Sequence, residues 1–91
     1  MGVVLHINNL PFGITTFDLN DFFGIHGKVL RAIVISDKLS GVSKGYGFVE
    51  MANETEAKQA ISFLDNKEIA GRNISVSLAK SQTWPHNAID N

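Results

Sequence analysis

The sequence predicts an α+β fold, a two-layer sandwich in which two helices cover one face of a four-stranded antiparallel sheet. Three observations lead to this prediction. Four short segments are rich in β-branched residues or alternate apolar with polar side chains, as strands do. Two longer segments repeat apolar residues at helical spacing. These segments follow one another in the order β-α-β-β-α-β, which leaves the second face of the sheet without a helical cover.

The first half of the chain is predicted to form a strand, a helix and a second strand. Residues 3–7 are apolar and largely β-branched, and turn residues follow them. Thr15 and Asp18 resemble a capping box, so a helix should begin there. We expect this helix to end at Gly27, because glycine readily takes the backbone conformation that closes a helix. Residues 29–35 then form the second strand.

The second half repeats the pattern of strand, helix and strand. Residues 37–43 are polar and contain a glycine, which predicts a loop between antiparallel strands, and residues 45–51 form the third strand. Asn53 followed by Glu56 repeats the capping pattern before a second amphipathic helix. Residues 73–78 alternate between apolar and polar side chains, as expected of a last strand.

The chain is expected to consist of one domain and a tail. Its 91 residues suffice for a single core, and 44% hydrophobic with 19% charged residues are values typical of a globular protein. We expect the domain to span residues 1–80. Residues 81–91 are polar and show no periodicity, which predicts a flexible tail. Trp84 either folds back onto the domain or is disordered, and the composition of the tail favours disorder.

Composition excludes several classes of protein. The chain has no cysteine, which excludes disulfides, thiol catalysis and cysteine-ligated zinc, and favours an intracellular setting, nuclear or cytoplasmic. No apolar run is long enough to span a membrane, and the first residues lack the pattern of a secretory signal. His6, His26 and His86 lack helical pairing and interleaved carboxylates, so we expect neither a metal nor a cofactor.

Strand alternation assigns a distinct set of side chains to the uncovered sheet face, because residues two apart in a strand point to the same side. Tyr46 and Phe48 lie together there, with glycines beside them, whereas Leu30 and Leu78 should point toward the helices. An exposed apolar patch ringed by polar groups typically marks a binding site. The outward set comprises His6, Asn8, Arg31, Ile33, Ile35, Lys44, Tyr46, Phe48, Glu50, Ser75, Ser77 and Lys80.

The distribution of charge matters more than its total. A net charge of −1 is low for a protein that binds nucleic acid mainly through phosphates. Acidic residues such as Asp18 and Glu54 stand at predicted helix starts, away from the uncovered face, where Glu50 is the single acid. We therefore expect a polarised molecule whose cations border the aromatic rings and which relies on stacking more than on charge.

These residues resemble the RNA recognition motif family. Residues 44–51, Lys-Gly-Tyr-Gly-Phe-Val-Glu-Met, are similar to the RNP1 octamer of that family at seven of eight positions, and Met51 is the exception. Residues 5–10 resemble its RNP2 hexamer. The resemblance covers residues 3–80. It implies the ferredoxin-like arrangement of the predicted elements, and binding of single-stranded RNA without catalysis.

The resemblance also implies roles for individual residues. His6, Tyr46 and Phe48 would carry the stacking rings, and Lys44 would contact the RNA backbone. His6 departs from the Phe or Tyr that the family prefers, since its imidazole offers less area and can become charged near pH 6.5. We therefore expect weaker binding than in a relative with three rings, and tightening at mildly acidic pH.

The remaining outward residues are assigned by their chemistry. We expect Arg31 and Lys80 to attract phosphates or bond to base edges. Asn8, Ser75 and Ser77 carry polar groups that read base edges. Ile33 and Ile35 either support the rings or contact a base.

Other functions compete with this interpretation. Protein-interaction modules share the fold, and a protein partner could meet Phe17 and Phe63 on the helices, although local packing is the simpler account of both. Small acyl-phosphate hydrolases share the element order but need an arginine in the first turn, and residues 9–13 contain none. Single-stranded DNA stays open as a ligand, because stacking does not distinguish the sugars. We expect a monomer with no membrane contact.

Overall fold

The computed structural model describes residues 2–85. The end of the expected tail, including His86, lies outside the described residues. The elements follow one another as β1 (Val3–Asn8), α1 (Thr16–Gly24), β2 (Val29–Ser36), β3 (Ser43–Met51), α2 (Glu54–Leu64), β4 (Glu68–Ile69), β5 (Arg72–Asn73) and β6 (Ser75–Leu78).

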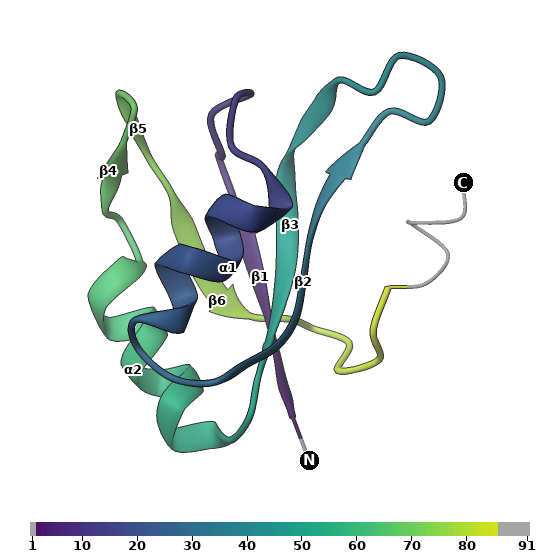
Figure 1. Ribbon diagram of the computed structural model, residues 1–91. Helices are drawn as coiled ribbons and strands as arrows, with labels where there is room; N and C mark the ends of the chain where they lie inside the picture. Colours follow the sequence, from purple (N-terminus) through teal and green to yellow (C-terminus); the bar gives the residue numbers. More distant parts are fainter. Residues whose placement is uncertain (1, 86–91) are drawn as a thin grey trace.

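The main sheet has four antiparallel strands in the order β2-β3-β1-β6, so β1 and β3 are central. Both helices lie on one side of this sheet (Figure 1). The predicted fold class is therefore confirmed. Neither helix within residues 2–85 has the length and apolar character needed to cross a membrane. Within the same range, no group of three or more His, Asp or Glu side chains could hold a metal ion.

The helix starts follow the predicted capping patterns. The Asp18 N–H donates to Thr15 Oγ1 at 3.1 Å and the Thr15 N–H donates to Asp18 Oδ2 at 2.9 Å, which forms a reciprocal capping box. The Glu56 N–H donates to Asn53 Oδ1 at 2.9 Å, but the Glu56 carboxylate accepts from the Lys28 N–H at 2.6 Å instead of returning to the backbone of Asn53. The start of α2 is thereby tied to the chain that enters β2.

The hydrophobic core lies between the sheet and the helices. Inward residues of the two central strands meet apolar side chains of both helices, and Met51 is fully buried there, as alternation predicted. The main core residues are Leu5, Ile7, Leu19, Phe23, Val49, Met51, Ala57, Ala60, Leu64, Ile74 and Val76.

Strand alternation fails at two positions on the edge strands. Leu30 is 48% exposed although we expected it to face the helices, because the pairing of β2 with β3 shifts between Val29 and Arg31 and leaves Leu30 as the extra residue of a bulge. Leu78, the last residue of edge strand β6, is 54% exposed. Beyond the bulge, Arg31 pairs with Glu50 and the predicted faces of β2 are restored.

Two boundaries also differ from the sequence predictions. Helix α1 ends at Gly24 rather than Gly27. The expected strand over residues 73–78 is divided, because β4 and β5 form a separate hairpin whose turn, Ala70-Gly71, has positive φ at both positions. At the division, the Ile74 N–H donates to the Lys67 carbonyl at 3.0 Å, so the chain joins the main sheet only from Ser75.

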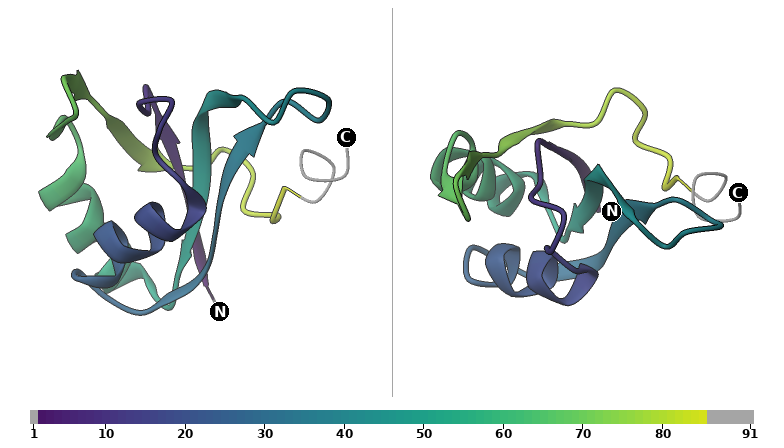
Figure 2. Two further views of the ribbon diagram at one scale, coloured as in Figure 1. Left: turned by 45° about the horizontal axis from the view of Figure 1, so that its top comes forward. Right: turned by 90° about the horizontal axis from the view of Figure 1, so that it is seen from above.

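The segment that follows β6 crosses the sheet on the side away from α1 (Figure 2). Its residues Ala79 and Trp84 form a second buried apolar cluster with Val4 of β1, and Ile33 and Phe48 pack against this cluster. The uncovered face of the sheet is therefore partly covered by the chain itself.

Candidate functional site

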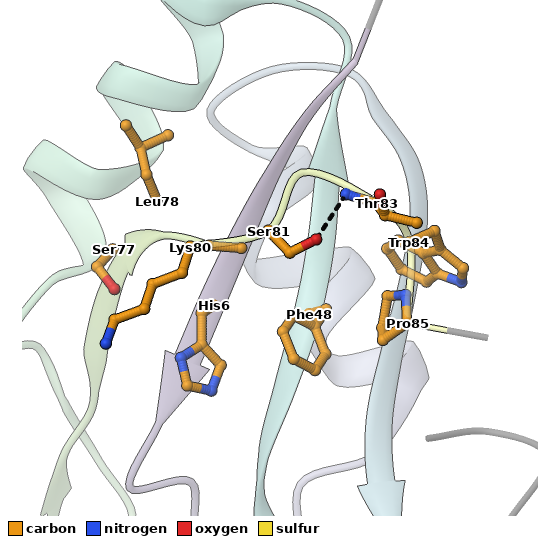
Figure 3. Close-up of a pocket in the computed structure, with 10 residues that line it drawn as sticks. His6, Phe48, Ser77, Leu78, Lys80, Ser81, Thr83, Trp84 and Pro85 are labelled. Carbon is orange, nitrogen blue, oxygen red and sulfur yellow. Dashed lines mark hydrogen bonds between the residues drawn. The ribbon is translucent and has the colours of Figure 1, made fainter. Parts of the chain in front are cut away.

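Three predicted rings lie together at the centre of the open sheet face. Register pairs His6 of β1 with Phe48 of β3, and their ring centroids lie 5.0 Å apart with planes inclined by 20°. Tyr46 presents an edge to both, at 5.8 Å from His6 and 6.1 Å from Phe48. Figure 3 shows the rings of His6 and Phe48 side by side on neighbouring strands. All three rings are partly exposed, so together they form an accessible aromatic floor.

The two isoleucines of β2 lie beside these rings, and they differ in burial. Register pairs Ile33 with Phe48 and Ile35 with Tyr46. Ile33 packs against the cluster that contains Trp84, and Ile35 is only 3% exposed. The burial of Ile35 fits a role in supporting the rings, whereas Ile33 stays partly exposed and either role remains a prediction for it.

Trp84 differs most from its sequence expectation. We expected it to be disordered in a mobile tail, but it is 7% exposed and packs on Val4 and Ala79. Its indole buries more apolar area than any other side chain of the tail could, which makes this burial the main favourable contribution to docking of the segment. A single tryptophan in a polar segment is the only sequence signal that could have predicted it.

Gln82 holds the same segment to the start of β1. Its Oε1 accepts from the Val4 N–H at 2.7 Å, and its Nε2 donates to the Val4 carbonyl at 3.0 Å and to the Ala79 carbonyl at 2.9 Å. The side chain thus gives the Val4 N–H its partner and adds a second donor to the Val4 carbonyl, which also accepts from the Ala79 N–H at 3.0 Å. Nothing in the sequence pattern distinguishes this glutamine, because its partners are set by the docked conformation.

Arg31 is engaged within the protein. Its Nε lies 2.6 Å from Glu50 Oε1, and its guanidinium lies 4.6 Å from the centre of the Trp84 ring. Arg31 and Glu50 therefore neutralise each other, and the Arg31 guanidinium forms a shelf under the indole. Arg31 was predicted to attract phosphates, as were Lys44 and Lys80, and these two lysines are exposed.

A groove of about 870 Å³ lies over part of the aromatic floor. His6 and Phe48 form its base, β6 contributes Ser77, and Lys80 lies at its rim (Figure 3). The rest of its lining comes from the end of β6 and the segment beyond it: Leu78, Ala79, Ser81, Thr83, Trp84 and Pro85.

The three polar residues that were predicted to read base edges lie in two different parts of the sheet face. Ser77 lines the groove, whereas Asn8 and Ser75 pair with each other at the other end of the β1–β6 ladder. All three side chains are exposed. Tyr46 and Lys44 lie outside the groove, on the length of β3 that leads away from it. The structure therefore combines His6, Phe48, Ser77 and Lys80 in one cleft.

Burial lowers the pKa of His6 below its ordinary value of 6.5, because desolvation penalises the charged imidazolium. The ring is therefore neutral at pH 7. Tightening of binding at mildly acidic pH stays a prediction, and the lowered pKa means that His6 of the free protein becomes charged only at more acidic pH than an exposed histidine does.

The same shift predicts how stability depends on pH. The unfolded state binds the proton of His6 more tightly than the folded state does, so the contribution of His6 is complete above about pH 6.5 and is lost as pH falls below it. We expect the free energy of unfolding in urea to fall more between pH 7.5 and 5.5 in the parent than in His6→Phe, which keeps every other titrating group. Equal losses in the two proteins would contradict the assignment to His6.

The helical face carries a second group of exposed aromatic residues. Phe63 is 65% exposed but stacks on His26, with centroids 4.9 Å apart and planes inclined by 4°, which matches the local packing that we expected. Phe17 is 83% exposed at the start of α1.

The comparison with protein families matches this architecture. The model of the RNA recognition motif matches residues 5–75. The chain belongs to the RNA recognition motif family. The resemblance that the RNP1-like and RNP2-like segments carried is thereby confirmed.

Relatives of this RNA recognition motif include chloroplast proteins. RNA-binding protein CP31B, chloroplastic, from Arabidopsis thaliana is 42% identical over 79 residues, which cover 87% of this chain and 27% of that protein. The 28 kDa ribonucleoprotein, chloroplastic, from Spinacia oleracea is 40% identical over 78 residues, which cover 86% of this chain and 34% of that protein. The chain thus spans between a quarter and about a third of the length of these relatives.

Solved RNA recognition motif structures superpose closely on the chain. RNA Binding Protein PG1 has a TM-score of 0.85 at 34% identity, covering 90% of this chain and 99% of that one. The Sxl-lethal protein in complex with RNA has a TM-score of 0.80 at 37% identity, covering 85% of this chain and 47% of that one.

Proposed function

We propose that this domain binds single-stranded RNA, without catalysis, on the sheet face that the helices leave open. The observation that carries the proposal is the register of His6 with Phe48, which places two nearly parallel rings at the base of a groove with Lys80 at its rim. Unpaired bases stack on such rings, and each stacked base contributes about 1–3 kcal/mol.

The related proteins support RNA as the ligand. RNA-binding protein CP31B carries that function in its name, and the Sxl-lethal protein was solved with RNA bound. We propose that the present domain acts in the same way and as a monomer, because a single chain supplies the whole groove. The chloroplast proteins among its relatives support an intracellular compartment. A protein partner on the helical face would use a separate surface, where Phe17 is exposed.

Phosphate contacts should be few. Arg31 is paired with Glu50, so Lys44 and Lys80 are the cations that we assign to the RNA backbone. Each phosphate neutralised on a single strand contributes about −0.7 to the slope of log K against log salt concentration. Two such contacts predict a slope near −1.4, which is shallow for a nucleic-acid-binding protein.

A salt titration tests both the ligand and this assignment. We expect labelled single-stranded RNA octamers of randomised sequence to bind the parent at low salt with that shallow slope. Lys44→Ala should reduce the magnitude of the slope by about 0.7, whereas Arg31→Gln should leave it unchanged. The same titration with DNA octamers distinguishes the nucleic acids.

Absence of RNA binding at low salt would contradict the proposed function and favour the protein-interaction alternative. A slope that responds to Arg31→Gln as strongly as to Lys44→Ala would contradict the assignment of cations alone.

A further inference from the structure

Residues 79–85, here called the Trp84 segment, run across the open sheet face from the end of β6 to β2. Figure 3 shows Ser81 and Thr83 above the central strands and Trp84 with Pro85 at the β2 side of Phe48. The segment is attached at its middle and near its end. Gln82 bonds the backbone of Val4, and the indole of Trp84 stacks on the Arg31 guanidinium.

We propose that the Trp84 segment is a fixed wall of the RNA site, which stays docked when RNA binds and closes the site on its β2 side. The proposal rests on the proposed function and adds a boundary to it. Bases are confined to the floor of His6 and Phe48 and to the open side toward Tyr46, and the RNA turns away from the sheet instead of continuing over Ile33.

The groove itself is the first argument for a wall. Its volume of about 870 Å³ exists with the segment in place, and its lining combines the ring of Phe48 with Trp84 and Pro85. Pockets that enclose small ligands measure about 300–1,000 Å³, so a base with its sugar has room without displacing the segment. The segment packs against Phe48, yet the rings of His6 and Phe48 both stay partly exposed with the segment in place.

The shelf beneath the indole is the second argument. Displacing Trp84 would expose an aromatic ring that is 7% exposed and would separate it from Arg31. The surface uncovered in exchange is Ile33, an aliphatic side chain that offers no ring for stacking. A base moving onto β2 would therefore gain a poorer contact than the one it removes, while the hydrogen bonds of Gln82 would be lost as well.

The wall also places polar groups beside the floor. Ser81 Oγ accepts from the Thr83 N–H at 3.3 Å, which turns the chain at the edge of the groove, and both residues line it. A base lying on the floor would meet this edge with its hydrogen-bonding groups. The docked segment would therefore contribute to affinity.

Trp84 is the only tryptophan of the chain, so its fluorescence reports on the wall directly. We expect the emission to stay at the wavelength of a buried indole when single-stranded RNA octamers of randomised sequence saturate the parent, with no increase in quenching by iodide. A red shift with increased iodide quenching would show that the segment leaves the sheet, and would overturn the proposal.

Variants supply the second readout. Trp84→Ala should weaken binding of the RNA octamers about fivefold or more, the scale of one lost contact to a base, and Trp84→Phe should restore most of the affinity. Gln82→Ala leaves the indole present but unfastens it, so we expect greater iodide quenching in the free protein together with weaker RNA binding. The Gln82→Ala variant provides the test if Trp84→Ala does not fold. If folded Trp84→Ala or folded Gln82→Ala bound RNA as tightly as the parent or more tightly, the proposal that the segment is a wall of the RNA site would be overturned.

Failure of the wall and failure of the proposed function are distinguishable. If the parent binds no RNA, or if Phe48→Ala binds as well as the parent, the proposed function is wrong. If Phe48→Ala weakens binding while Trp84→Ala strengthens it, the function stands and the Trp84 segment is a competitor of RNA.

Discussion

Phe48→Ala is expected to weaken binding of single-stranded RNA about 5- to 150-fold, which corresponds to the ~1–3 kcal/mol that a stacked base contributes. Phe48 lies on a central strand, forms the base of the groove and stands in register with His6. Removing its ring therefore interrupts the middle of the aromatic floor. Fluorescence anisotropy of labelled RNA octamers of randomised sequence measures the loss.

Two further variants separate stacking from packing. Phe48 also packs against the cluster of Trp84, so Phe48→Leu retains an apolar side chain there while it removes the flat ring, and it should lose most of the affinity as well. Phe17→Ala removes the same ring from an exposed site on α1 and should bind RNA like the parent. If Phe48→Ala bound RNA as strongly as the parent, or if Phe17→Ala lost as much affinity, stacking on the aromatic floor would be contradicted.

Gly47→Ala is expected to lower the free energy of unfolding by about 3 kcal/mol, at the upper end of the cost of overpacking. A Cβ at this position would collide with the carbonyl oxygen of Ile33 and would lie 3.1 Å from Leu19 Cδ1 and 3.2 Å from Val34 Cα. The first of these neighbours is backbone of the adjacent strand, so it can yield only if β2 and β3 separate. Urea unfolding monitored by circular dichroism measures the change.

Gly24→Ala is the matched control for that substitution. Gly24 lies at the end of α1, and a Cβ added there meets no atom within 4 Å. Alanine in place of a helical glycine should leave stability unchanged or raise it by about 0.5–1 kcal/mol. If Gly47→Ala proved as stable as Gly24→Ala, the close approach of β2 to β3 would be contradicted.

Local chemistry predicted much of the fold. The capping box of Thr15 with Asp18 and the cap at Asn53 are interactions between residues three apart, so they can be recognised without knowledge of the tertiary structure. The shared face of Tyr46 and Phe48 follows from the two-residue period of a strand, which is equally local. The order of these elements then limited the fold to few arrangements.

The sequence predictions were wrong at positions whose structure depends on pairing between strands. The bulge at Leu30 depends on the register of β2 against β3, and the hairpin of β4 with β5 depends on the turn at Ala70-Gly71. The burial of Ile35 likewise depends on its neighbours across the sheet. None of these follows from the periodicity of a single segment.

The sequence by itself determined which face of the sheet carries the rings, because alternation along β1 and β3 leaves no choice once the strands form. Only the tertiary structure decided how much of that face is open. Docking of Trp84, fastening by Gln82 and neutralisation of Arg31 by Glu50 join residues distant in sequence. Such contacts form only after the sheet has brought their partners together, so no sequence pattern in the tail predicts them.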